Sequence, residues 1–298
     1  MRYKDTFASY HPLVNFLYFG LVMGFTMFFM HPVCLIISLT VSAWYDLYLD
    51  GKKALKFQCF FMVPVILMAA FLNPAFNHEG ETLLYYLPSG NVLTLESIAY
   101  GIGAACMLAA IVLWFACYNQ IMTSDKFVYL FGRLIPALSL VLSMSLRFVP
   151  KFKKHLQVVK EAQRCIGRDS SYGSLFTRLR NAITIFSIMV TWAMENAIET
   201  ADSMKSRGYG LPGRTAFSIY RFDDRDKMAM AWLIFTGAYV FLGAWVGGLY
   251  FRYYPTMKTV ALSGFSASFM LAYLALCLSP LVINIREDMK WKRLRSEI

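Results

Sequence analysis

The stretch NAITIFSIMVTWAMENAIETADSMKSRG, residues Asn181–Gly208, is apolar enough in its first half to be mistaken for a membrane span. Polar residues recur in it every three or four positions, which places them on one face of a helix. They are Thr184, Ser187, Thr191, Glu195, Glu199 and Asp202. Because the opposite face is apolar, the stretch predicts a long amphipathic helix from about Asn181 to Arg207, lying outside the membrane.

The end of this helix, ADSMKSRGYG at residues 201–210, combines charge with glycine. Gly208 can adopt the left-handed conformation that closes a helix. Arg207 beside it complements the negative end of the helix dipole, and its guanidinium can pair with carboxylates of a partner. A helix end of this kind is also compatible with ordinary capping and solvated charge.

A second stretch of the same kind precedes it. The segment Leu134–Glu161 carries polar side chains along one face, and Pro150 is expected to bend the helix. It leads into the tip EAQRCIGRDSSYG, residues 161–173, where Arg164 and Arg168 lie one turn apart around Gly167. The sequence therefore predicts two long helices with similar basic, glycine-marked ends.

The chain as a whole has the composition of a membrane protein. Of its 298 residues, 58% are hydrophobic and 16% are charged, whereas soluble domains carry about 25% charged residues. About six apolar runs reach the length of a span. They are Leu13–Met30, Val33–Leu49, Phe57–Leu72, Leu95–Tyr118, Met228–Tyr250 and Met257–Ile285.

The positive charges indicate the topology. The loop Gly51–Lys56 is basic, the loop Asn73–Thr94 lacks Lys and Arg, and the tail Arg286–Ile298 is basic again. By the positive-inside rule both termini are expected in the cytoplasm, together with the strongly basic segment Asn119–Lys227. The fold class expected is an all-α membrane protein: spans in residues 1–118, a cytoplasmic coupling domain with two long helices in residues 119–227, and two spans with a basic tail in residues 228–298.

These residues resemble a known family, the transmembrane T component of energy-coupling factor transporters, the CbiQ-like proteins. The resemblance is sharpest over LIPALSLVLSMSLRFVPKFKKHLQVVKEAQRCIG (residues 134–167) and IETADSMKSRGYG (residues 198–210), and YHPLVNFLYF (residues 10–19) is similar to the family's first span. In the family, two coupling helices each end in an Ala-Arg-Gly signature. Ser206, Arg207 and Gly208 match the second signature, whereas Cys165, Ile166 and Gly167 stand at the first, with Ile166 in place of the arginine. Arg164 and Arg168, both within one turn, are the alternatives for the missing arginine.

The resemblance implies a scaffold with three partners and the lipid bilayer around it. Two ABC-type ATPase subunits would bind the two tips, and a substrate-binding membrane subunit, the S component, would lie on the apolar faces of the coupling helices. The importer would take up a vitamin or a metal ion across the cell membrane. The residues expected to contact the ATPases are Arg164, Gly167, Arg168, Ser206, Arg207 and Gly208. Those expected to face the S component are Leu138, Leu142, Ile185, Met189 and Ala193.

The residues themselves argue against other functions. There is no phosphate-binding GxxxxGK[ST] loop, no HExxH or GxSxG motif, and no expected metal site, cofactor or nucleic-acid partner. The chain is thus expected to be a non-catalytic subunit. The alternative is a self-contained secondary transporter in which Leu134–Pro150 and Ala182–Ile198 are spans. Two smaller features are expected to be structural: Gly243-Ala-Trp-Val-Gly247 as a packing face between spans of this protein, and Asp223–Asp226 as a solvated helix start.

Overall fold

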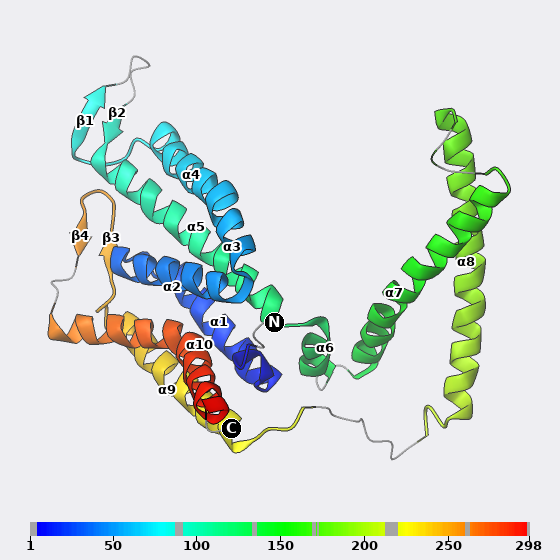
Figure 1. The fold of residues 1–298 in the computed structure, drawn as a ribbon. Coiled ribbons are helices and arrows are strands. Elements are labelled where there is room, and N and C mark those ends of the chain that lie inside the picture. Colours follow the sequence, from blue (N-terminus) through cyan, green and yellow to red (C-terminus); the bar gives the residue numbers. More distant parts are fainter. Residues whose placement is uncertain are drawn as a thin grey trace. The chain divides into compact units, whose positions relative to one another are not determined.

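The structure is a computed structural model that describes residues 5–86, 92–132, 136–168, 171, 173–211, 220–259 and 263–296. For residues 132, 136–140, 295 and 296 it describes the backbone alone. The chain forms two compact units (Figure 1). The first, called the span unit below, comprises residues 1–123 and 220–298, and the second, called the helix-pair unit, comprises residues 124–219.

The span unit is built from apolar helices, so the prediction of an all-α membrane protein is confirmed. Five helical segments are long and apolar enough to cross a membrane within the described residues, and α1 is a shorter apolar helix. The helices are α1 (Pro12–Phe28), α2 (Pro32–Asp50), α3 (Lys52–Phe57), α4 (Val63–Phe76), α5 (Leu95–Ile121), α9 (Asp224–Trp245) and α10 (Gly264–Ser296). A π-helical turn, η2 (Gln58–Met62), joins α3 and α4 into one segment.

The first two apolar helices begin in the same way. In both His11-Pro12 and His31-Pro32, the histidine caps the helix and the proline occupies its first turn. The Nδ1 atom of His11 accepts a hydrogen bond from Leu13 N at 3.3 Å, and that of His31 accepts one from Val33 N at 3.3 Å. Proline suits this position because its missing N–H would have no partner in the helix. Helix α2 thus begins at Pro32, shortly after α1 ends at Phe28.

Two connections between helices of the span unit contain short strands that the sequence did not predict. Strands β1 (Leu83–Tyr86) and β2 (Val92–Thr94) pair antiparallel, and so do β3 (Phe251–Arg252) and β4 (Lys258–Thr259). The second hairpin corrects the expected sixth span, which was placed at Met257–Ile285. Because Met257 lies in this hairpin connection, the last helix begins only at Gly264.

Hydrogen bonds between side chains join four helices at the centre of the span unit. The indole Nε1 of Trp114 on α5 donates to Ser38 Oγ on α2 at 2.9 Å. Thr26 Oγ1 on α1 lies 2.7 Å from Ser38 Oγ and 2.9 Å from the Tyr273 hydroxyl on α10. Polar groups in an apolar interior are costly unless they are paired, so these contacts also specify which helix faces meet.

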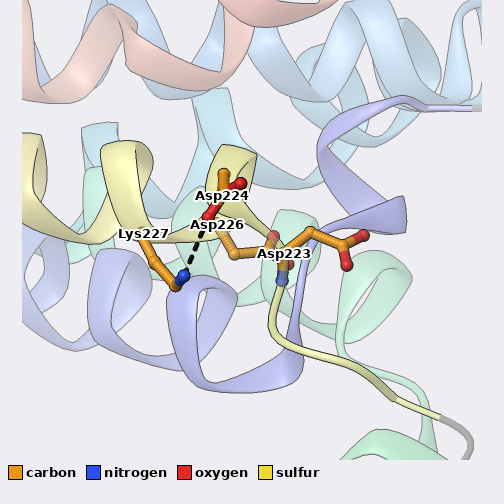
Figure 2. A network of polar contacts seen from close by, with 4 residues as sticks. All are labelled: Asp223, Asp224, Asp226 and Lys227. Carbon is orange, nitrogen blue, oxygen red and sulfur yellow. Dashed lines mark hydrogen bonds and ion pairs between the residues drawn. The ribbon is translucent and has the colours of Figure 1, made fainter.

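The start of α9 is tied to the start of α1 by a carboxylate. Asp226 Oδ2 accepts a hydrogen bond from Asp223 N at 3.1 Å, and Asp226 Oδ1 accepts one from His11 N at 3.1 Å. Figure 2 shows these aspartates with the ion pair between Asp224 and Lys227, whose charged atoms are 2.8 Å apart. The expectation of a solvated helix start is wrong for Asp226, which is buried, because its carboxylate satisfies two backbone donors.

Glycines on α9 and α5 allow neighbouring side chains to approach closely. A methyl group added at Gly243 would overlap the Phe269 ring of α10, and one added at Gly103 would overlap the Tyr253 hydroxyl. The expected packing role within this protein is therefore confirmed for Gly243. It is wrong for Gly247, which has a φ of +80° and lies just beyond the last residue of α9, where it closes the helix.

The helix-pair unit contains α6 (Ser124–Gly132), α7 (Pro136–Cys165) and α8 (Leu175–Ser206). The helix expected from about Asn181 begins earlier, at Leu175, where Ser174 Oγ accepts a hydrogen bond from Thr177 N at 3.4 Å. Helices α7 and α8 run antiparallel (Figure 1). They bury a small apolar cluster between them: Val159, Ile185 and Met189, with Phe152, Leu156 and Trp192 against it.

Candidate functional site

The two long helices of the helix-pair unit end in the same backbone motif. At the end of α7, Arg168 N donates to Gln163 O at 2.9 Å and Gly167 N donates to Arg164 O at 3.0 Å. At the end of α8, Tyr209 N donates to Met204 O at 3.0 Å and Gly208 N donates to Lys205 O at 2.9 Å. These paired bonds define a Schellman cap.

Glycine is required in both caps. Gly167 has a φ of +76° and Gly208 a φ of +78°, in the left-handed region that side chains disfavour. The end of α9 forms the same pair of bonds, from Gly247 N to Ala244 O and from Gly248 N to Gly243 O. The cap by itself therefore marks no partner site, and any docking role depends on the side chains presented around it.

The common cap aligns the two tips residue by residue. Cys165 corresponds to Ser206, Ile166 to Arg207 and Arg168 to Tyr209, counted from the glycines. Ile166 thus stands at the position of Arg207. Arg168 stands two residues later, on the far side of the glycine. All of the six expected ATPase-contacting residues are exposed except Gly208, which is half-buried.

The tips lie at opposite ends of the helix pair. The α7 tip, with Arg164, Gly167 and Arg168, adjoins the start of α8, and the α8 tip, with Ser206, Arg207 and Gly208, is separated from it by the length of α8 (Figure 1). The 32 residues of α8 correspond to about 48 Å. The structure therefore groups the six residues into two separate sites.

A pocket adjoins the α8 tip. It has a volume of about 520 Å³ and lies between the early part of α7 and the last two turns of α8. Its charged lining residues are Arg147, Lys151, Glu199 and Arg207, and Met144, Phe148 and Met204 contribute apolar wall. Three cations face one carboxylate, so the pocket is suited to an anionic group. Arg147 and Lys151 lie within the segment whose polar face the sequence predicts, but no sequence pattern connects them with Arg207.

Lys151 also holds the two helices together. Its Nζ donates a hydrogen bond to Asn196 Oδ1 on α8 at 2.5 Å and lies 5.6 Å from the centre of the Trp192 ring. One turn after Lys151 on α7, the His155 ring stacks on the Trp192 ring of α8 with centroids 4.0 Å apart. These contacts fix the crossing point and thereby position Arg147 opposite Arg207.

An apolar groove occupies the other half of the helix pair. Its volume is about 710 Å³, and nearly all of its lining is apolar apart from Lys153 and Lys160. The lining residues from α8 are Ala182, Ile185, Phe186, Met189, Val190, Ala193, Met194 and Ala197. Three of the residues expected to face an S component, Ile185, Met189 and Ala193, thus lie along this groove.

The groove lining differs in part from the set of residues expected to face an S component. Ile185 and Met189 form its floor and are buried against α7, while Phe186, Val190 and Met194 are exposed at intervals of four residues. These three residues were not among those expected to face an S component, although their spacing places them on one helix face. Leu142 is half-buried on α7 and is not part of the groove lining, and the Leu138 side chain lies outside the part that the structure describes.

No metal site is present in the described residues: nowhere do three or more His, Cys, Asp or Glu side chains gather as ligands. The side chains around both tips, in the pocket and in the groove offer guanidinium and ammonium groups for anions, and apolar walls for apolar side chains.

A family model described as CbiQ, cobalt transport protein, matches residues 8–219. The chain is similar to the energy-coupling factor transporter transmembrane protein EcfT 1 of Listeria monocytogenes, with 34% identity over 98 residues, or 33% of this chain and 37% of the relative. It is 32% identical over 112 residues to the EcfT protein of Bacillus selenitireducens, covering 37% of this chain and 42% of the relative. It is also 32% identical over 101 residues to that of Lactobacillus helveticus, covering 34% and 36%. The matched part spans about two fifths of the length of these relatives.

Proposed function

Because the chain belongs to the CbiQ family of cobalt transport proteins, we propose that it is the transmembrane scaffold of an energy-coupling factor importer. In this role it is a multi-pass protein of the cell membrane with both termini in the cytoplasm. It catalyses no reaction. Two ABC-type ATPase subunits bind its helix-pair unit, and their ATP-driven motion passes through α7 and α8 to a substrate-binding S component that carries a vitamin or a metal ion.

One observation carries the proposal: two long amphipathic helices pack against each other and end in equivalent caps at opposite ends of the pair, in which α8 alone is about 48 Å long. Two separated tips suit two ATPase subunits better than one. The helices are joined by an apolar cluster and by the Lys151–Asn196 hydrogen bond, so a displacement of one tip is transmitted along the pair. The apolar groove between them then provides the surface on which an S component is carried.

The alternative, a self-contained secondary transporter, requires α7 and α8 to be spans. Within the described residues neither helix has the apolar character of a membrane-crossing segment. Cysteines introduced singly at Ser187 and Thr191, on the polar stripe of α8, distinguish the two functions. A scaffold leaves them reactive toward a water-soluble maleimide added from the cytoplasmic side, whereas a span facing lipid protects them.

The docking role is tested by Arg207→Glu in the full-length chain, with Lys154→Glu as matched control. Both positions are exposed, but Lys154 lines neither the pocket nor the groove. Reversing a charge at a desolvated contact costs about 2–5 kcal/mol, equivalent to roughly 30-fold weaker binding or more. Arg207→Glu should therefore lose the ATPase subunits on purification and lose uptake, while Lys154→Glu retains both. Wild-type retention and uptake in Arg207→Glu would show that the α8 tip is not a docking site.

A further inference from the structure

The two tips share one backbone cap but present different side chains. The cap places Ile166 and Arg207 at the same position, immediately before the left-handed glycine. Ile166 is 63% exposed. An aliphatic side chain at this position cannot form the ionic contact that the guanidinium of Arg207 can form.

The side chains around the two tips also differ in polarity and charge. The first residues of α8, Leu175 and Phe176, are 82% and 78% exposed. Ile166 at the α7 tip and these two residues are thus large apolar side chains that are exposed on the helix pair. At the α8 tip, Arg207 adjoins Arg147 and Lys151 in a pocket that carries a single carboxylate. The end of the helix pair with the α7 tip therefore exposes apolar side chains, and the end with the α8 tip exposes cations.

We propose that the two tips dock by different chemistry, an inference that rests on the proposed function. The α8 tip binds carboxylates of one ATPase subunit. The α7 tip inserts Ile166 into a groove of the other ATPase subunit that is lined by apolar side chains. Arg164 and Arg168 lie beside Ile166 in the chain and suit carboxylates at the rim of that groove.

Because the proposed function assigns one ATPase subunit to each tip, the partner that meets Ile166 is the second ATPase subunit. Residues at the same place in the same cap, at the two ends of one helix pair, present themselves to partners in the same way. The competing interpretation is that Arg168 replaces the missing arginine. Arg168 corresponds to Tyr209, however, and is separated from the Arg207 position by the glycine. A groove that receives the residue before the glycine therefore meets Ile166.

The two chemistries respond differently to salt. Ionic contacts between exposed groups weaken as ionic strength rises, because the screening length falls from about 10 Å at 0.1 M to about 3 Å at 1 M. Apolar contacts are not weakened in this way. A variant that binds only through the α7 tip should therefore hold its partner at high salt, and one that binds only through the α8 tip should release it.

The experiment uses the full-length chain in detergent and, as probe, the purified ATPase subunits that co-purify with it from native membranes. Their dissociation constant is measured at about 0.1 M and about 1 M salt. Ile166→Asp should weaken binding about tenfold or more, since it places a charge in an apolar groove, whereas Ile166→Leu should bind like wild type. Arg168→Ala should change binding by less than about threefold, as rim charges do. Residual binding of Arg207→Ala should be nearly independent of salt, and that of Ile166→Ala should fall steeply with salt.

Each result supports or overturns the inference. If Ile166→Asp binds like wild type while Arg207→Glu does not, the α8 tip docks as proposed but the apolar docking of the α7 tip is wrong. If Arg168→Ala loses more binding than Ile166→Ala, Arg168 replaces the arginine and the inference is also wrong. If Ile166→Asp keeps the ATPases but loses the S component, the apolar tip belongs to that partner instead. If neither Ile166→Asp nor Arg207→Glu loses ATPase, the proposed function fails. Unchanged unfolding temperatures, expected at such exposed positions, exclude misfolding as the cause.

Discussion

Asp226 and His11 are 215 residues apart in the chain, yet the Asp226 carboxylate accepts a hydrogen bond from the His11 backbone N–H at 3.1 Å. The bond joins the start of α9 to the start of α1. The same carboxylate accepts the backbone N–H of Asp223, so one side chain completes the N-terminus of α9 and anchors it in the span unit. Asp226 thus fixes the point at which the chain re-enters the span unit.

Asp226→Ala should therefore lower the stability of the purified chain by about 1–3 kcal/mol, because it leaves two backbone donors without their acceptor. Asp224→Ala is the matched control. Asp224 lies two residues earlier, and its side chain is 92% exposed, so loss of its ion pair with Lys227 should change stability by less than about 1 kcal/mol. Thermal unfolding in detergent measures both. Equal unfolding temperatures for the two variants would contradict the anchoring role of Asp226.

His31 should make the stability of the chain sensitive to acid. It caps α2 through Nδ1, and burial lowers the pKa of its imidazole from the ordinary value of 6.5. Folding therefore favours the neutral form. The contribution of neutral His31 to the free energy of unfolding is present above pH 6.5. It is lost as the pH falls from there toward the lowered pKa of His31 in the folded state.

His31→Asn provides the measurement, since asparagine also caps helices but does not titrate. Between about pH 8 and about pH 5, the unfolding temperature of the wild type should fall further than that of His31→Asn. Parallel pH profiles for the two proteins would show that His31 does not contribute to acid sensitivity.

Gly243→Ala should destabilise the contact between α9 and α10 by about 1–3 kcal/mol. The added methyl group overlaps the ring of Phe269, which is buried and cannot move aside. Gly24→Ala on α1 is the control, because a methyl group there meets nothing within 4 Å. It should leave the unfolding temperature unchanged or raise it, since alanine favours helix. A Gly243→Ala protein as stable as wild type would show that the two helices separate easily at this point.

The sequence predicts those parts of the fold that depend on local patterns. The apolar runs, the polar stripe on α8 and the glycines at residues 167 and 208 each specify structure within a few turns, and the structure has helices and caps at these places. The two hairpins were missed because strands of two to four residues give too short a pattern. The start of the last helix was misplaced for the same reason.

The candidate site was predictable only in part, since it depends on which faces of α7 and α8 meet. The stripe identified Ile185 and Met189 as apolar but could not show that α7 covers them and leaves Phe186 and Met194 outside. Arg147 and Arg207 are 60 residues apart in number, and no local pattern connects them. Their shared pocket follows from the antiparallel packing that Trp192, His155 and Lys151 establish.

Phe186→Asp should weaken the association of the S component about 30-fold or more, because loss of a central aromatic anchor costs about 2 kcal/mol or more. Phe186 is 70% exposed and lines the apolar groove. Ser187→Asp introduces the same charge one residue later, on the polar stripe, and should be tolerated. Co-purification of the S component and substrate uptake measure the effect, while retention of the ATPases serves as an internal control. Loss of the S component from both variants alike would argue against the groove as its binding surface.

Arg147→Ala should weaken ATPase binding about tenfold, because Arg147 lines the same pocket as Arg207 and is suited to the same anionic group. Lys154→Ala removes an equally exposed cation from α7 outside the pocket and should change the dissociation constant by less than about twofold. The decisive measurement is the double variant Arg147→Ala/Arg207→Ala. If both guanidinium groups contact one set of partner carboxylates, the two losses are not additive, and the coupling should amount to about 0.5–3 kcal/mol. If the two losses of binding free energy are strictly additive, the partner contacts the tip of α8 alone, and Arg147 on α7 makes no direct contact with it.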